Sequence, residues 1–194
     1  MEGAGLKVSD LACRRGDRVL FRGLSFALEP GQALQVLGTN GTGKSSLLRI
    51  VAGLLPPFTG TVERGGEVAL LDERLPLDEH QPLGKALAFW DGFDGNDYGE
   101  AALASVGLAE LADVPVRFLS TGQRKRAAFL LSNRRGGGLW LLDEPLNGLD
   151  ANGADMLVAT VAAFCAQGGC ALIASHQPFP LAGLKQFELL DYIP

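Results

Sequence analysis

Short, mainly apolar runs recur along the chain, each bounded by glycine, proline or charged residues. Runs of four or five such residues are too short for helices, and they fit buried strands because a strand covered on both faces shows no polar alternation. This predicts strands at residues 33–37, 68–71, 139–142 and 170–174. Further strands are predicted at 60–63 and 187–190. Residues 6–28 fit two or three β segments, with turns at Gly16–Asp17 and Arg22–Gly23.

Between these runs the apolar residues change to helical spacing. The segment 46–54 carries leucine, isoleucine and valine at positions that share one helix face. A second helix is predicted over 151–167, where Asp150 can cap the first turn and Gly168–Gly169 ends the helix. Helical spacing also marks residues 83–90 and 101–108, which indicates a helical insertion.

Strands that alternate with helices predict an α/β fold with a mainly parallel sheet, here preceded by an antiparallel β part. We expect a single domain, 1–194, with a core of residues 1–71 and 136–194 and a helical subdomain of residues 72–135. In such sheets ligands bind beyond the carboxyl ends of the strands. The residues that follow predicted strands are therefore the candidates for chemistry.

Composition narrows the class of protein without defining it. The net charge of −5 gives no general attraction to nucleic acid or anionic lipid. The three cysteines follow no metal-ligand spacing and are expected to be reduced thiols in a cytosolic protein. The uncharged stretch 156–184 could suggest a membrane span, but Gly168–Gly169 and two prolines interrupt it. A buried helix and a buried strand explain this stretch better, and no signal peptide is expected.

The segment after strand 33–37 matches G-x-x-x-x-G-K-[ST], the phosphate-binding loop. Its glycines let backbone N–H groups converge on phosphate oxygens, and the following helix N-terminus favours negative charge. Lys44 is expected to reach the β- and γ-phosphates of a nucleotide, and the Ser45 hydroxyl to bind Mg²⁺. A glycine-rich turn that binds nothing is the alternative. The predicted nucleotide-binding residues are Gly38, Thr39, Asn40, Gly41, Thr42, Gly43, Lys44, Ser45 and Ser46.

Two carboxylates follow the apolar strand 139–142. Asp143 stands where the Walker B aspartate of phosphate-loop proteins binds Mg²⁺. Glu144 is the next residue and is predicted to polarise an attacking water as a general base. The alternative, a surface loop that happens to begin with Asp-Glu-Pro, is less favoured in a chain that also carries a phosphate-binding loop.

Residues 119–123 read Leu-Ser-Thr-Gly-Gln and lead into a basic helical stretch. They are similar to the Leu-Ser-Gly-Gly-Gln signature of ABC-type ATPases, with one glycine replaced by threonine. The resemblance implies that this segment closes on nucleotide held by a second, identical subunit, whereas a simple helix N-cap is the alternative. The residues concerned are Ser120, Thr121, Gly122 and Gln123.

Two further motifs occur in the order of this family. The segment 147–150 looks like the family's D-loop and contains Asp150. His176 follows strand 170–174, where the resemblance implies a catalytic switch histidine that contacts the γ-phosphate; a purely structural histidine is the alternative. The implied fold is the ABC nucleotide-binding domain among phosphate-loop NTPases.

The chain departs from the family pattern at two positions. Arg15 stands where an aromatic residue often stacks on adenine, and its guanidinium can also stack on a base. Residues 72–74 read Asp-Glu-Arg where the family usually has a glutamine that contacts Mg²⁺ and water. Glu73 could bind Mg²⁺ there, or the segment could be a solvated run of charges.

Within the family, the chain looks most like the ATP-binding subunit of the haem exporter of bacterial cytochrome c maturation. Short length, Leu139–Trp140 before Asp143, and His176–Gln177 after the last core strand carry this resemblance. It implies an ATPase that uses Mg²⁺, works as a homodimer and drives integral membrane transporter subunits. It also implies peripheral attachment to the cytoplasmic face of the inner membrane.

The membrane subunits are expected to contact residues 72–85 and the exposed sides of Leu87, Phe89 and Trp90. One alternative function is the ATPase of another small exporter. A non-transport ABC ATPase that acts on nucleic acid or ribosomes is disfavoured, because the chain has one such domain and no room for a long coiled coil before the signature. No nucleic acid partner is expected, and a nucleotide kinase would have no reason to carry the signature.

Overall fold

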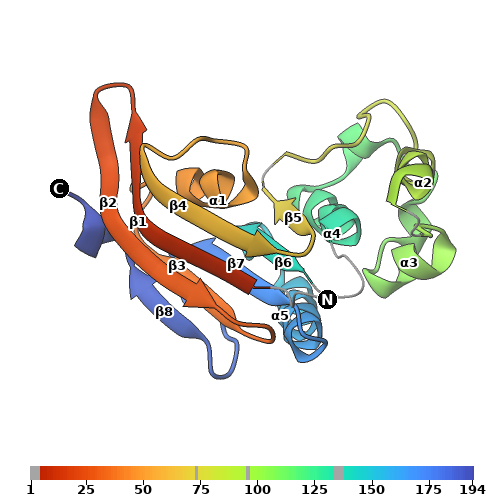
Figure 1. The fold of residues 1–194 in the computed structure, drawn as a ribbon. Helices are drawn as coiled ribbons and strands as arrows, with labels where there is room; N and C mark the ends of the chain where they lie inside the picture. Colours follow the sequence, from red (N-terminus) through yellow and green to blue (C-terminus); the bar gives the residue numbers. More distant parts are fainter. Residues whose placement is uncertain (1–4, 73, 95–96, 133–137) are drawn as a thin grey trace. The chain divides into compact units, whose positions relative to one another are not determined.

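The computed structural model describes residues 5–72, 74–94, 97–132 and 138–194, and these form two compact units (Figure 1). The first unit consists of Met1–Asp72, Arg134–Pro145 and Val158–Pro194, and the second of Glu73–Asn133 and Leu146–Leu157. The second unit therefore takes in Leu146–Leu157, which the sequence-based division assigned to the core. This grouping arises from contacts between residues distant in sequence, which local sequence patterns do not predict.

The first unit contains the predicted parallel sheet, with strand order β5-β6-β7-β3-β8. Every residue of β6 and β7 is buried, which explains why these segments carry no polar alternation. The predicted α/β fold class is confirmed. The strands are β3 (Ala33–Leu37), β5 (Val68–Leu71), β6 (Leu139–Asp143), β7 (Cys170–Ser175) and β8 (Lys185–Glu188).

A second, antiparallel sheet of the same unit has the order β2-β1-β4. Its strands are β1 (Gly5–Arg15), β2 (Arg18–Leu28) and β4 (Thr59–Gly65). The predicted turn at Gly16–Asp17 is confirmed, but the one at Arg22–Gly23 is wrong, because β2 continues through it. Leu11 pairs with Leu24 and Cys13 with Phe21, so β2 holds one extra residue there. Gly23 has a φ of 71° in this β-bulge, a conformation that glycine adopts at little cost.

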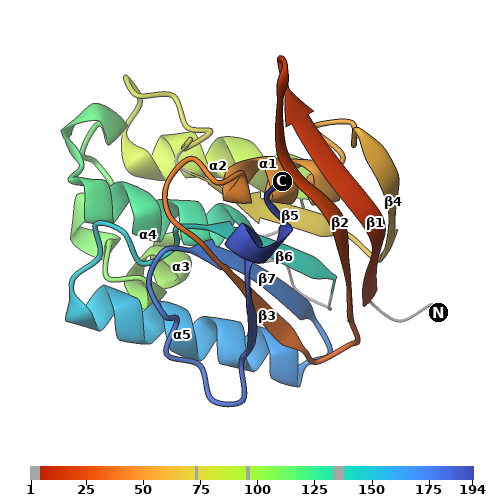
Figure 2. The ribbon, with the colours of Figure 1, turned by 90° about the vertical axis from the view of Figure 1, so that its left-hand side faces the viewer.

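Helix α1 (Lys44–Ala52) packs with both sheets in one hydrophobic core of the first unit (Figure 2). The helix begins two residues before the predicted start and ends at Ala52, ahead of Pro56 and Pro57. Gly53 has a φ of 80°, and its N–H donates to the carbonyl oxygens of Arg49 and Ile50. A glycine C-cap therefore ends α1 before the prolines are reached.

The end of the chain differs from the predicted strand at 187–190. Strand β8 begins earlier, at Lys185, and stops at Glu188. The short 3₁₀ helix η3 (Leu189–Tyr192) follows it, and Leu189 is fully buried in the core of the first unit. A turn of helix thus places Leu189 and Tyr192 against the core and leaves Leu190 exposed, where an extended strand was expected.

The second unit is helical, as the spacing of its apolar residues predicts. Its elements are α2 (Leu83–Asp94), α3 (Glu100–Ser105), η1 (Ala109–Leu111), η2 (Val116–Phe118) and α4 (Thr121–Ser132). These helices enclose a separate hydrophobic core. Leu87 is fully buried in that core, so its prediction as part of an exposed surface is wrong. Its neighbour Phe89 points away from the core and is 63% exposed.

The uncharged stretch from residue 156 onward forms a helix followed by a strand, as expected. Helix α5 (Ala151–Ala166) ends before Gly168, which has a φ of 90°, and the buried strand β7 follows. Among the helices of the described residues, none has both the length and the apolar character needed to cross a membrane.

Candidate nucleotide site

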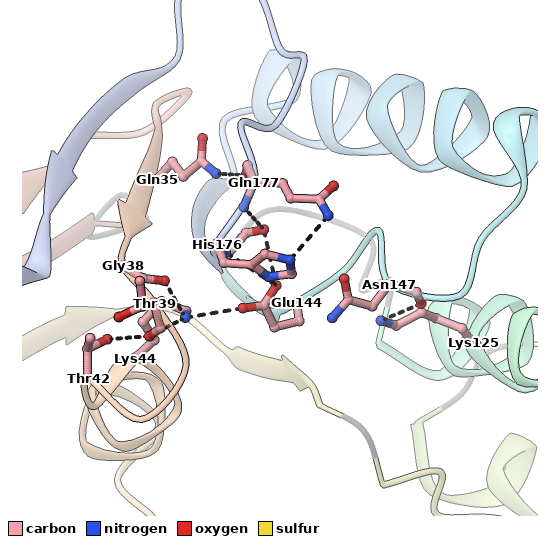
Figure 3. A network of polar contacts seen from close by, with 11 residues as sticks. Gln35, Gly38, Thr39, Thr42, Lys44, Lys125, Glu144, Asn147, His176 and Gln177 are labelled. Carbon is pink, nitrogen blue, oxygen red and sulfur yellow. Dashed lines mark hydrogen bonds and ion pairs between the residues drawn. The ribbon is translucent and has the colours of Figure 1, made fainter.

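The predicted phosphate-binding loop lies in the first unit, between β3 and α1 (Figure 3). Gly41 and Gly43 have φ values of 82° and 111°, in the left-handed region that favours glycine. A Cβ at Gly43 would also lie 3.2 Å from the Leu20 side chain, so β2 packs directly on the loop. In the described part of the chain, no side chain caps α1 at Gly43. Its first N–H groups are thus available for an anion.

Lys44 is held inside this loop and is only 5% exposed. Its Nζ donates to the carbonyl oxygens of Gly38 at 2.7 Å and Thr39 at 3.2 Å. Nζ also forms an ion pair with Glu144 Oε1 at 3.2 Å. All three partners are oxygens. Phosphate oxygens can therefore replace them without leaving the ammonium group unpaired in a buried position.

Asp143 ends strand β6 and is 7% exposed. Burial raises the pKa of its carboxyl above the ordinary value, and a hydrogen bond with Ser45 lowers it only in part. Within the described residues, Asp143 Oδ1 is buried and has no hydrogen-bond partner. A buried carboxylate oxygen of this kind, beside a serine hydroxyl, has the chemistry that Mg²⁺ prefers. The donor set of Asp143 and Ser45 therefore fits the predicted metal.

Replacement of Asp143 with asparagine should raise the melting temperature of the nucleotide-free chain in EDTA. Since the pKa of Asp143 is raised, the folded state disfavours the ionised carboxylate and loses stability at neutral pH. The amide carries no charge and should avoid this loss. We expect a gain of about 2–4 °C, which corresponds to about 1 kcal/mol at this chain length. A lower melting temperature for Asp143→Asn, measured by calorimetry, would contradict the argument.

Glu144 lies directly after β6 with a φ of 44°, which is unusual for a residue other than glycine. Its N–H donates to the Ala174 carbonyl at 2.8 Å, and this bond ties it to the end of β7. Glu144 Oε2 accepts hydrogen bonds from Ser175 Oγ at 3.2 Å and His176 Nδ1 at 2.8 Å. Burial raises the pKa of this carboxyl, but bonds from His176 and Lys44 outweigh burial and hold the pKa below the usual glutamate range. Glu144 is thus an ionised acceptor.

The first unit therefore brings together four residues that were predicted from three separate motifs: Lys44, Asp143, Glu144 and His176. Sequence reasoning missed Ser175, whose hydroxyl contacts Glu144 Oε2. It also missed Gln35, which is fully buried and bonded to the segment after His176. The available signal was a single amide inside the otherwise apolar strand 33–37.

For three residues predicted to bind the nucleotide or its metal, the contacts described above give no support. Glu73 lies outside the described residues. Arg15 is exposed at the end of β1, opposite Arg18, and its role in base stacking stays a prediction. The Ser46 side chain forms a hydrogen bond with the Cys13 thiol, where it partly offsets the rise in pKa caused by burial. Any contact of Ser46 with phosphate would therefore use its backbone N–H.

In the second unit, the predicted signature forms the start of helix α4. Gln123 N–H donates to Ser120 Oγ at 3.2 Å, and Ser120 N–H donates to Gln123 Oε1 at 2.8 Å. These reciprocal bonds are a capping box, so the N-cap alternative is correct as a description of the local structure. A capped helix start still presents backbone N–H groups, and the cap does not exclude a role in anion binding.

The signature packs on the predicted D-loop within the same unit. A Cβ at Gly122 would lie 2.7 Å from the Gly148 carbonyl oxygen, and Lys125 Nζ donates to the Asn147 carbonyl at 3.2 Å (Figure 3). Asp150 Oδ1 accepts from Gly153 N–H at 2.9 Å and caps α5, as predicted. These contacts explain why the D-loop belongs to the helical unit.

Replacement of Gly122 with alanine should destabilise the second unit. The added methyl group would collide with the Gly148 backbone, and we expect a loss of about 1–3 kcal/mol in urea denaturation. Gly92 is the matched control because it lies inside α2 and a Cβ there meets nothing within 4 Å. Gly92→Ala should gain about 0.5–1 kcal/mol. Equal stability of the two variants would contradict the packing argument.

Comparison with known proteins identifies the family of this chain. Residues 21–147 match the ABC transporter family. The chain therefore belongs to the ABC transporter family and is an ATP-binding subunit with that fold.

Within that family the chain groups with cytochrome c biogenesis ATP-binding export proteins named CcmA. It is 53% identical to the one from Novosphingobium aromaticivorans over the full length of both chains. It is 47% identical to the one from Zymomonas mobilis, over 98% of this chain and 86% of that protein. A putative ABC transporter ATP-binding protein from Pyrococcus furiosus shares the fold, with a TM-score of 0.82, 20% identity, and coverage of 98% of this chain and 100% of that one.

Proposed function

We propose that this chain is the ATP-hydrolysing subunit of the haem exporter of cytochrome c biogenesis. Relatives that are 40–53% identical over nearly the whole chain are named as cytochrome c biogenesis export proteins, which supports the choice of pathway. The observation that carries the chemistry is the cluster of Lys44, Glu144 and His176. It joins a buried cation, an ionised base and a switch histidine by contacts of 2.8–3.2 Å.

In the proposed reaction, Lys44 Nζ binds the phosphates of ATP and its ion pair with Glu144 breaks. Freed from the lysine, Glu144 can accept a proton from the water that attacks the γ-phosphate. His176 then contacts the γ-phosphate from the end of β7. Ser45 and Asp143 would hold Mg²⁺, which neutralises charge on the phosphate oxygens when bound.

Hydrolysis is proposed to occur in a sandwich of two identical subunits, with the signature of one subunit against ATP bound to the other. ATP hydrolysis then drives integral membrane subunits, to which the chain attaches at the cytoplasmic face of the inner membrane. The closest alternative, an ATPase of another small exporter, shares every site residue and differs only in its membrane partner.

Co-purification tests the proposal and separates it from the alternatives. The chain is affinity-purified from membranes of its native host after mild detergent treatment, and the bound proteins are identified by mass spectrometry. Integral membrane proteins required for cytochrome c maturation are the expected partners. Subunits of an unrelated exporter would favour the second candidate, and bound ribosomes or nucleic acid would overturn the transport function.

The surface for the membrane partner is proposed to include Phe89 rather than Trp90. Trp90 is packed against the core of the second unit and its Nε1 donates to the Pro76 carbonyl at 3.0 Å, so Trp90→Ala should mainly lower stability. Phe89→Glu should keep ATP hydrolysis of the purified chain but weaken membrane association on the order of tenfold in flotation assays. Leu54→Glu is the control, since Leu54 is 69% exposed and belongs to the first unit, outside the proposed surface. Equal membrane association of both variants would exclude Phe89 from this surface.

A further inference from the structure

A fully buried glutamine side chain joins strand β3 to the segment that follows His176. Gln35 Nε2 donates to the Gln177 carbonyl at 2.7 Å, and the Phe179 N–H donates to Gln35 Oε1 at 3.1 Å. The amide thus binds one acceptor and one donor of the same backbone segment. Since buried polar groups are costly to leave unpaired, these two bonds fix that segment against β3.

The fixed segment in turn places a second amide against the imidazole of His176 (Figure 3). Gln177 Nε2 lies 3.1 Å from His176 Nε2, and His176 Nδ1 lies 2.8 Å from Glu144 Oε2. An amide NH₂ group can only donate, so His176 Nε2 acts as the acceptor. The carboxylate of Glu144 can only accept, so His176 Nδ1 carries the proton.

We propose that Gln35 and Gln177 are positioning residues that hold His176 as the Nδ1–H tautomer, with its proton directed at Glu144. Gln177 acts on the ring directly, and Gln35 acts by fixing the backbone of Gln177. This arrangement orients both Glu144 and His176 before nucleotide arrives. Its effect on hydrolysis rests on the proposed function, whereas the tautomer itself does not.

Nitrogen NMR tests the tautomer on the nucleotide-free full-length chain. The sequence has only two histidines, so ¹⁵N-histidine labelling gives two imidazole patterns. The other histidine, His80, is an internal reference with the opposite tautomer. Arg117 Nη1 donates to His80 Nδ1 at 2.9 Å, so that nitrogen is an acceptor. We expect the proton on Nδ1 in His176 and on Nε2 in His80. An Nε2–H or doubly protonated His176 at neutral pH overturns the proposal.

Two variants test the role of the amides. Gln177 is exposed, so Gln177→Met should fold normally, and it should leave His176 as a mixture of tautomers. Gln177→Glu places an acceptor beside Nε2 and should draw a proton onto that nitrogen. If His176 keeps the wild-type pattern in both variants, Gln177 does not set the tautomer.

Kinetics separate this role from a merely structural one. Gln35→Met has a similar volume but removes both bonds to the segment after His176. We expect kcat for ATP to fall on the order of 10- to 100-fold with KM within about twofold, because His176 and Glu144 are misplaced while the phosphate loop is intact. An unchanged kcat in a folded Gln35→Met overturns the role of Gln35. Hydrolysis absent from the wild type would instead refute the proposed function and leave the NMR result standing.

Discussion

Replacement of Lys44 with alanine should weaken Mg-ATP binding by about 10- to 100-fold. This loss corresponds to about one hydrogen bond to a charged group, at about 1.5–3 kcal/mol, because the bonds of Lys44 to phosphate replace bonds that it already makes to oxygens of the empty site. The buried ammonium group is already in place, since it is bonded to the carbonyl oxygens of Gly38 and Thr39. Its loss should therefore remove binding energy directly, and titration calorimetry on the wild type and the variant measures it.

The matched control for Lys44→Ala is Lys7→Ala in the same unit. Lys7 pairs with Glu63 at 3.7 Å, and both side chains are about two-thirds exposed, at 65% and 68%. An exposed ion pair of this kind contributes little, so the control should bind Mg-ATP as the wild type does. Nucleotide affinity that is equal in Lys44→Ala and Lys7→Ala would refute the assignment of the phosphate-binding loop.

Local sequence patterns predicted the parallel strands and the phosphate-binding loop because both depend on neighbouring residues. Strands β6 and β7 are buried on both faces, so their apolar runs are unbroken. The loop needs glycines at fixed spacing, and Gly41 and Gly43 have the positive φ values that this spacing implies. The motif order then indicated which strand ends hold the remaining site residues.

Features that depend on distant contacts were missed or misplaced. The Arg22–Gly23 dipeptide resembles a turn, but pairing with β1 extends β2 through it and turns the glycine into a bulge. Leu87 was expected on an exposed surface for the membrane subunits, yet the second core buries it. Gln35 becomes informative only when its partners Gln177 and Phe179 are known, and these are remote in sequence.

Glu144→Gln should slow ATP hydrolysis by about 10²- to 10⁴-fold, the range for loss of a general base. The amide is nearly isosteric but cannot accept the proton of the attacking water. Nucleotide binding should persist, because in the empty site the Glu144 carboxylate competes with phosphate for Lys44 Nζ at 3.2 Å. The amide competes less, so the affinity for Mg-ATP should be equal to or higher than that of the wild type. Single-turnover hydrolysis and calorimetry measure the two effects separately.

The same variant tests the two-subunit arrangement, because slow hydrolysis leaves ATP in place for the signature of a second chain. We expect Glu144→Gln to sediment as a dimer with Mg-ATP, in the presence of its membrane partner if the isolated chains do not associate. Glu63→Gln is the control, since it removes an exposed carboxylate of the same unit that pairs only at the surface. This control should hydrolyse ATP at the wild-type rate. It should therefore not accumulate as an ATP-bound dimer in sedimentation. A wild-type rate of hydrolysis in Glu144→Gln would refute Glu144 as the general base. Slow hydrolysis by a chain that stays monomeric with ATP and its membrane partner would instead support Glu144 as the base and refute the two-subunit sandwich. The two parts of the proposed function therefore fail independently.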